Sequence, residues 1–277
     1  MSFAQFPEKR VFITGAGSGF GRAFAVEFAR MGWQVAIAEI NPERAAGTAG
    51  LVSRAGGQPR EMICDVSQPE SLEAAAEEIK EAWGGLDILV NNAGVAAAGR
   101  VENTPLETWE WILTLNTRSI IYGCRAFIPM LKAQGCGYIV NMASNAGIAS
   151  LPEMGCYNVT KAAAISLSET LRGELAPYNI GVSVICPTFF KTNLMDQFTS
   201  PEAEQRRMAN AFFNKSRITP EQVARHAIKR INKSKFYIIA QADGKFMWYA
   251  KRFFPETYFK VMAYIYKTGK FKKYLGI

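Results

Sequence analysis

Short runs of apolar residues alternate along the chain with longer segments in which apolar and polar residues follow a helical period. Most of the runs are nearly continuous in Val, Ile and Leu, which is typical of parallel strands buried on both faces. The repeated alternation predicts an α/β fold, with one doubly wound parallel seven-stranded sheet and helices on both faces. The predicted strands cover residues 10–14, 34–38, 61–64, 86–91, 138–143, 181–186 and 236–240, and the predicted helices cover about 20–30, 42–54, 69–83, 107–134, 154–176 and 219–232.

No repeat, low-complexity stretch or linker interrupts this pattern before residue 244, so we expect one domain over residues 1–244 and an extension over 245–277. The sequence has no run of about 20 apolar residues and no signal-peptide pattern, so we expect a cytoplasmic protein without a transmembrane helix. The five cysteines show no CxxC spacing, which argues against a disulfide framework or a metal site. The single histidine, His226, excludes chemistry that needs two histidines.

A glycine-rich turn follows the first predicted strand and leads into the first predicted helix. Glycine lets the backbone turn sharply and approach a pyrophosphate, and the helix points its N–H groups and its positive dipole end at that phosphate. Glycines also make ordinary turns, but here strand, turn and helix occur in the required order. The sequence therefore predicts phosphate binding at Gly15, Ser18, Gly19, Phe20 and Gly21.

Two acidic residues stand at the ends of the next two predicted strands. Glu39 ends the second strand, 18 residues after Gly21, where a carboxylate can accept hydrogen bonds from the ribose hydroxyls of an adenosine. The alternative is a solvated acid at a strand end. Asp65, followed by Val66, ends the third strand and could accept from an adenine amino group, but a turn or cap role stays open.

Tyr157 and Lys161 lie four residues apart in a predicted helix and therefore share a face. A nearby ammonium is expected to lower the pKa of the phenol, which would make Tyr157 usable as a proton donor or acceptor. This spacing alone is common on solvated helices. Its weight comes from Ser144 at the end of the fifth strand, because ligands of open α/β sheets bind outside the carboxyl ends of the strands. Asn116 is a polar residue inside a predicted long helix.

Over residues 8–240 the chain resembles the short-chain dehydrogenases/reductases, whose single domain has a Rossmann-type fold. The resemblance rests on TGAGSGFG (14–21), Asp65, NNAG (91–94), Asn116, Ser144, YNVTK (157–161) and PTFFKT (187–192). It implies that Tyr157 is the general acid/base, that Lys161 lowers the pKa of Tyr157 and holds the nicotinamide ribose, and that Ser144 orients the substrate oxygen. It further implies a proton-relay water at Asn116 and an adenosine ribose beside Asn92, Ala93 and Gly94.

The sequence departs from the family at Pro187-Thr188, where Pro-Gly is usual; the added side chain narrows the nicotinamide side. Thr192 matches the residue expected to touch the cofactor amide. Glu39 disfavours the 2′-phosphate of NADP, and the neighbouring Ile40 is not basic, so we expect NAD. Arg44 lies nearby and keeps NADP as the alternative.

We expect an apolar substrate pocket, closed by a lid over residues 192–217, and hence a hydrophobic secondary alcohol or ketone of long-chain, terpenoid or steroid-like type. The same side chains could instead serve core packing or dimer contacts. A non-catalytic NAD(P)-sensing or scaffold protein, an NADP-dependent carbonyl reductase, and a dehydratase or epimerase are the alternative functions. The predicted substrate residues are Ser144, Leu151, Met154, Phe189, Phe190, Leu194 and Met195.

The extension accounts for nearly all of the net charge of +8, because residues 245–277 hold eight Lys and Arg residues against one Glu. The nearly neutral domain predicts no nucleic-acid partner. The extension also holds 11 of the 33 aromatic residues, and Pro255 and Gly269 bracket a predicted amphipathic helix. Such a helix is typical of an element lying on an anionic membrane surface, but it could instead pack on the domain or on a neighbouring subunit. The resemblance also implies a homodimer or homotetramer, with helices 107–134 and 154–176 at an interface. This interface could include Trp109, Trp111, Ile112 and Leu171, but each of these side chains could instead be buried within the monomer.

Overall fold

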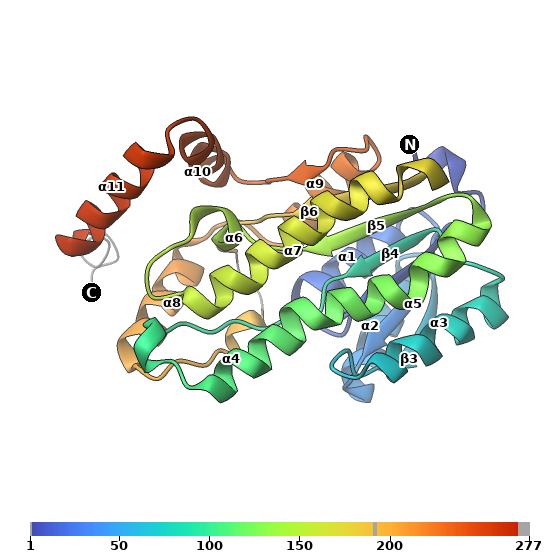
Figure 1. The fold of residues 1–277 in the computed structure, drawn as a ribbon. Helices are drawn as coiled ribbons and strands as arrows, with labels where there is room; N and C mark the ends of the chain where they lie inside the picture. The colour runs from blue at the N-terminus through green and yellow to red at the C-terminus, as the bar shows by residue number, and fades with distance from the viewer. Residues whose placement is uncertain (1, 191–192, 271–277) are drawn as a thin grey trace.

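The computed structural model describes residues 2–190 and 193–270 and contains one parallel sheet of seven strands in the order β3-β2-β1-β4-β5-β6-β7 (Figure 1). This confirms the predicted doubly wound α/β fold. The order reverses between β1 and β4, which is where ligands bind in such sheets. The strands are β1 Arg10–Thr14, β2 Gln34–Glu39, β3 Gln58–Ile63, β4 Ile88–Asn91, β5 Gly137–Met142, β6 Ile180–Ile185 and β7 Tyr237–Ile238.

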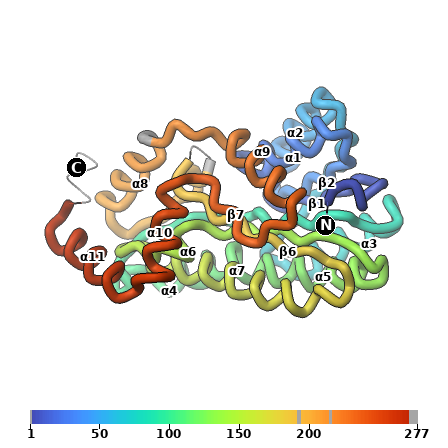
Figure 2. The backbone as a smooth tube through the Cα atoms, turned by 90° about the horizontal axis from the view of Figure 1, so that it is seen from above, coloured from blue at the N-terminus to red at the C-terminus, as the bar shows by residue number. Residues whose placement is uncertain are grey.

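Helices cover both faces of the sheet. Successive strand residues point to opposite sides, so apolar strands present hydrophobic side chains on both faces, and each face needs a layer of helices. Val11 and Ile13 pack in the core with α1 and α9, whereas Phe12 between them packs in the core on the other face. Figure 2 shows α1, α2 and α9 on one side of the sheet and α4, α5 and α7 on the other. The helices are α1 Gly19–Ala29, α2 Pro42–Arg54, α3 Pro69–Trp83, α4 Leu106–Leu113, α5 Ser119–Gln134, α6 Ala146–Ala149, α7 Gly155–Glu174, α8 Ala203–Lys215 and α9 Pro220–Ile231. Single 3-10 turns cover Phe3–Gln5, Val101–Asn103, Ala176–Tyr178 and Asn193–Met195.

The long helix predicted over residues 107–134 is interrupted by a π-helical turn at Thr114–Arg118. Asn116 lies in this turn, and its amide accepts from the backbone N–H of Val95 at 2.8 Å and donates to the Val95 carbonyl at 2.9 Å. The extra residue of a π turn changes the angle at which side chains leave the helix. Here the turn aims Asn116 at the segment that follows β4.

Two helices follow β7, namely α10 Ala242–Phe253 and α11 Pro255–Lys267. The helix expected between Pro255 and Gly269 is present, whereas α10 and α8 were not among the predicted helices. Both views place α10 and α11 at the end of the molecule opposite to α3 (Figures 1 and 2). Within residues 2–190 and 193–270, none of the helices is both long and apolar enough to span a bilayer.

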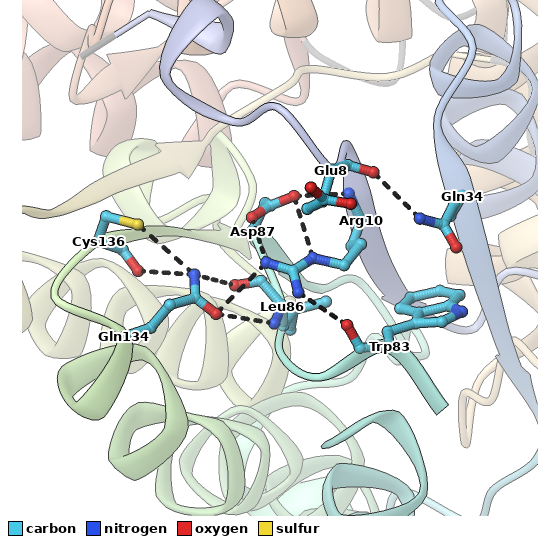
Figure 3. A network of polar contacts seen from close by, with 8 residues as sticks. All are labelled: Glu8, Arg10, Gln34, Trp83, Leu86, Asp87, Gln134 and Cys136. Atoms are coloured by element: carbon cyan, nitrogen blue, oxygen red, sulfur yellow. Dashed lines mark hydrogen bonds and ion pairs between the residues drawn. The ribbon is translucent and has the colours of Figure 1, made fainter. Parts of the chain in front are cut away.

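A buried ion pair joins β1 and β4 at their amino ends, opposite to the edge where ligands bind (Figure 3). The guanidinium of Arg10 contacts the carboxylate of Asp87 at 2.9 Å and donates to the carbonyl of Trp83, where α3 ends. Gln134, at the end of α5, accepts from the N–H of Leu86 and donates to the carbonyl of the same residue. These contacts fix the spacing of the two central strands.

Candidate active site

A cavity of about 1180 Å³ lies at the carboxyl ends of the strands, where the strand order reverses. Its volume is slightly above the range of about 300–1,000 Å³ that is typical of ligand sites. One part of the wall comes from the turns after β1, β2, β3 and β4, and the other from the segments after β5 and β6 together with α8 and α11. The predicted residues that line the cavity are Gly15, Ser18, Gly19, Phe20, Gly21, Glu39, Asp65, Val66, Asn92, Ala93, Gly94, Ser144, Leu151, Met154, Tyr157, Lys161, Pro187, Thr188, Phe189, Phe190 and Leu194.

The glycine-rich turn has no room for side chains, as a close approach of backbone to a pyrophosphate requires. A Cβ on Gly15 would lie 2.9 Å from the Cα of Ala93, and one on Gly21 would lie 2.2 Å from the carbonyl oxygen of Gly15. Gly15 and Gly19 have positive φ angles of 62° and 49°, which disfavour other residues. Asn92 supports the turn by donating to the Thr14 carbonyl at 2.9 Å. This geometry fits a dinucleotide phosphate at the N-terminus of α1.

Glu39 lies against the glycine-rich turn and is not a solvated surface acid. It is 8% exposed, and its carboxylate accepts from the backbone N–H groups of Gly17 at 3.0 Å, Ile40 at 3.1 Å and Asn41 at 3.2 Å. Three N–H donors stabilise the negative charge and fix its position in the cavity wall. Arg44 also lines the cavity.

Asp65 has a local structural role as well as a place in the cavity wall. Its carboxylate accepts from the backbone N–H of Ser67 at 2.9 Å, and its own N–H donates to the hydroxyl of Ser71. These bonds form the turn between β3 and α3, which is the alternative that the sequence left open. Cavity lining and turn formation are therefore compatible at this position.

Ser144, Tyr157 and Lys161 come together on one wall of the cavity. Tyr157 is 8% exposed and Lys161 is 3% exposed; the ammonium of Lys161 donates to the carbonyl of Met142 at 3.1 Å and lies 5.6 Å from the centre of the Tyr157 ring. Gly94 makes room for this arrangement, because a Cβ there would lie 2.7 Å from the Asn116 carboxamide oxygen and 3.5 Å from the Lys161 ammonium.

The pKa of Tyr157 differs from the expectation drawn from its spacing to Lys161. Burial raises the pKa of Tyr157 to about 12, although a hydrogen bond with Ser144 acts in the opposite direction. Burial also lowers the pKa of Lys161 to about 8. The pKa of Tyr157 is therefore raised, whereas its spacing to Lys161 led us to expect a lowered pKa. The physical reason is that desolvation disfavours the charged form of both groups.

Asn116 does not line the cavity. Its side chain is completely buried, with Val95 on both ends of the amide and the hydroxyl of Thr160 at 3.2 Å from Nδ2. Thr160 in turn donates to the carbonyl of Tyr157 at 2.9 Å. Asn116 thus ties the segment after β4 to the helix that carries Tyr157 and Lys161, while its predicted relay water stays a prediction.

Thr188, the residue that departs from the family pattern, contacts the segment after β7. Its N–H donates to the buried carboxamide of Gln241 at 3.1 Å, and its hydroxyl lies 3.3 Å from the carboxylate of Asp243 at the start of α10. The segment after β6 is therefore fixed by the segment that leads into α10. Thr192 lies outside the described residues.

The substrate side of the cavity is mostly apolar. Phe189 stacks on Phe212 of α8 with ring centres 4.6 Å apart, so α8 forms part of the predicted lid. Phe190 is 7% exposed and also packs edge-on against Phe20 in the core, so it serves both the cavity wall and the core, as the alternative interpretation proposed. Met195, in contrast, is not among the cavity residues and packs with a hydrophobic cluster that includes Phe198.

Glu153 connects four segments around the cavity, and the sequence analysis missed it. Its carboxylate accepts from Tyr266 of α11 at 2.8 Å and from Gln205 of α8 at 3.4 Å, and lies 3.5 Å from Arg100. Its backbone carbonyl accepts from Gly99. In the sequence, an acidic residue just before a predicted helix gives no signal of such distant partners. Further cavity residues that were not predicted are Trp111, Gln205, Met247, Met262, Ile265 and Tyr266.

A model of the short chain dehydrogenase family matches residues 9–203, which is most of the chain. The protein belongs to the short-chain dehydrogenase family. It is 35% identical over 239 residues to the Probable oxidoreductase EphD of Mycobacterium tuberculosis (strain ATCC 25618 / H37Rv), a match that covers 83% of this chain and 40% of that protein. The chain therefore spans about two fifths of the length of this relative.

Two solved structures in complex with nicotinamide cofactors share the fold. A short chain dehydrogenase/reductase from Burkholderia phymatum in complex with NAD has a TM-score of 0.84 and 32% identity, with 89% of this chain and 94% of that chain covered. A short-chain dehydrogenase from Sphingobium yanoikuyae in complex with NADPH has a TM-score of 0.74 and 26% identity, with 86% and 90% covered. The neighbours thus support a nicotinamide cofactor without choosing between its two forms.

Proposed function

We propose that this short-chain dehydrogenase transfers a hydride between NAD(H) and a hydrophobic secondary alcohol or ketone, with Tyr157 as the general acid/base. The observation that carries the proposal is the position of Ser144, Tyr157 and Lys161 in one cavity that also contains the glycine-rich turn and an apolar wall. A dinucleotide on the turn and a substrate against the wall would meet at these three side chains. A scaffold protein would not need them.

The proton chemistry follows from the burial of these groups. A bound nicotinamide supplies the acceptor or donor of the hydride. In the oxidising direction the hydroxyl proton of the alcohol passes to the Tyr157 phenolate, while Ser144 donates a hydrogen bond to the substrate oxygen. In the reducing direction the Tyr157 phenol would give its proton to the carbonyl oxygen of the substrate. Because burial raises the pKa of Tyr157, the phenol keeps its proton at neutral pH, which is the form that the reducing direction needs.

The apolar wall supports a neutral, hydrophobic substrate of long-chain, terpenoid or steroid-like type. Phe189, Phe212 and Leu194 line the cavity that also holds Tyr157, and Met262 and Ile265 of α11 add to its apolar wall. An apolar wall favours a substrate whose binding removes apolar surface from water. The charged side chain of Glu153 on this side already contacts Tyr266, Gln205 and Arg100.

The proposed preference for NAD rests on Glu39. Its carboxylate is held by three backbone N–H groups at the end of β2, where it can accept from ribose hydroxyls and would repel a 2′-phosphate. NADP is the second candidate, because Arg44 also lines the cavity and a guanidinium could bind a 2′-phosphate.

The test is a screen of the purified protein against hydrophobic and polar secondary alcohols and ketones, with NAD(H) and with NADP(H), followed by the absorbance of the reduced cofactor. We expect turnover with hydrophobic substrates. Tyr157→Phe should lower kcat at least 100-fold, because positioned proton transfer typically contributes about 10²–10⁴-fold, while cofactor binding stays nearly unchanged. Turnover above a tenth of the original would exclude Tyr157 as the acid/base. Cofactor binding without turnover of any substrate would favour the sensing protein instead.

A further inference from the structure

The helices α10 and α11, residues 242–267, form an arm that carries an unusual number of exposed aromatic side chains. Phe246, Phe253 and Phe254 are 73%, 66% and 67% exposed. Phe246, Tyr249 and Phe253 follow the i, i+3, i+7 spacing of one helix face of α10, and Val261 and Tyr264 share a face of α11. The remaining exposed aromatic side chains of the arm are Phe259 and Tyr266.

A different set of side chains attaches the arm to the domain. The hydroxyl of Tyr258 donates to the carbonyl of Ala149 at 2.9 Å, and the ammonium of Lys251 donates to the carbonyl of Ile148 at 2.6 Å. Gly244 packs against Asn145, whose amide donates to the Gly244 carbonyl. The exposed face of Phe246, Tyr249 and Phe253 is therefore not needed to hold the arm in place.

Positive charge surrounds the exposed aromatic side chains. Lys245, Arg252, Lys260, Lys267 and Lys270 are exposed on the arm and just beyond it, and Lys251 is partly exposed. The carboxylates of the same segment are Asp243, which contacts Thr188, and Glu256. Lys260 and Lys267 are seven residues apart and therefore lie on one side of α11.

We propose that this arm docks on an anionic lipid surface. Aromatic side chains enter the boundary between headgroups and acyl chains, and Lys and Arg pair with anionic headgroups, so exposed Phe and Tyr interleaved with cations match such a surface. The positive charge of the arm favours an anionic lipid surface over a second copy of the same arm. Two arms face to face would bring cations against cations, and lysine is depleted in the centre of protein interfaces. The proposal does not rest on the substrate or on turnover.

The experiment is flotation of the full-length protein on a density gradient with two kinds of vesicle, phosphatidylcholine containing phosphatidylserine and phosphatidylcholine alone. We expect the protein to float with the anionic vesicles at low salt and to be released as salt rises, because screening weakens the lysine contacts. Replacing Phe253→Ser together with Phe254→Ser should reduce partitioning at least tenfold. Lys260→Gln and Lys267→Gln should each reduce it about fivefold.

Ile63→Ser is the matched control, because Ile63 is a 61% exposed apolar residue on the edge strand β3. The arm follows β7, which is the opposite edge strand of the sheet. The Ile63→Ser variant should float like the unchanged protein. All of the replaced side chains are exposed, so circular dichroism should show unchanged folding. Failure of the unchanged protein to float at low salt would overturn the proposal. It would also be overturned if the Phe253/Phe254 variant floated normally. If that variant also lost subunits in sedimentation, the arm would be a protein interface.

Discussion

Tyr157 and Lys161 illustrate how burial opposes the interaction that their spacing suggests. An ammonium near a phenol favours the phenolate, but both groups here are nearly inaccessible, and desolvation favours the neutral form of each. Burial lowers the pKa of Lys161 from 10.5 to about 8. The folded protein therefore releases this proton at a lower pH than the unfolded chain does.

This difference makes the stability of the protein depend on pH. Between pH 8 and 10.5 the unfolded chain binds more protons at Lys161 than the folded protein, so the free energy of unfolding should rise with pH in this window. Lys161→Met removes the titrating group, and the variant should lack a rise on the order of 3 kcal/mol. Urea unfolding of both proteins across the window measures the effect. The raised pKa of Tyr157 lowers stability only above pH 10, so the two proteins are compared between pH 8 and 10. Parallel profiles would contradict the prediction.

The role of a single residue could be predicted where it depends on neighbouring residues in the sequence, and not where it depends on contacts between distant segments. The glycine-rich turn could be predicted from sequence because its strand, turn and helix are contiguous, and the structure gives Gly15 and Gly19 the positive φ angles that only glycine adopts readily. Glu153 could not be predicted, because its contact with Tyr266 joins residues 113 positions apart. The buried state of Asn116 likewise depends on Val95 and Thr160, which come from different segments.

At the scale of elements, β2 and the glycine-rich turn together set the expected cofactor preference. The double variant Glu39→Ala with Ile40→Arg should raise the ratio of kcat/KM for NADP to kcat/KM for NAD by about ten- to a hundredfold. The two substitutions remove a negative charge and add a positive one where the 2′-phosphate of NADP is expected to lie. Glu39→Gln is the control, since it removes the charge but keeps a side chain of similar size against Gly17. Tighter binding of NADP than of NAD by the unchanged protein would refute the prediction. So would an unaltered ratio in the double variant.

Element boundaries were predicted well where apolar runs are long and poorly where tertiary contacts decide. The sequence pattern located β1 at residues 10–14, α2 at 42–54 and α3 at 69–83, as observed. It missed the π turn that separates α4 from α5, because a continuous helical pattern runs through it and only the bonds of Asn116 with Val95 reveal it. It began β3 three residues late because the edge strand is polar and largely exposed.

At the scale of the whole molecule, the structure changes which residues could join subunits. Ile112 and Leu171 are 0% and 5% exposed within the single chain, so they pack inside it, which was the alternative interpretation for each of them. Both face the core because they lie on the inner sides of α4 and α7. Trp109 and Trp111 are partly buried against a hydrophobic cluster. Val159 on α7, in contrast, is 48% exposed.

We propose a homodimer or homotetramer that buries the exposed face of α7. Sedimentation at micromolar concentration should give a mass at least twice that of the chain. Val159→Glu should shift the protein toward the monomer, because a charge buried without a partner opposes association. Ile63→Ser serves as the control, since it alters an exposed apolar residue on the edge strand β3. A monomer at this concentration would reject the proposal.

The ion pair between Arg10 and Asp87 lies at the amino ends of β1 and β4, so it supports the sheet without touching the cavity at the other end (Figure 3). Its side chains are 10% and 3% exposed, and removing one partner would leave a buried charge unpaired. Asp87→Ala should therefore lower the free energy of unfolding by about 3–5 kcal/mol in urea titrations, with little change in the Kd for the cofactor. Lys80→Ala, which breaks an exposed pair with Glu77, should cost less than about 1 kcal/mol.

Arg10→Met combined with Asp87→Ala should lower the free energy of unfolding by less than the sum of the two single changes, because the ion pair is already broken after the first change. A strictly additive result would show that Arg10 and Asp87 stabilise the sheet independently, through the Trp83 carbonyl and the Arg10 backbone N–H.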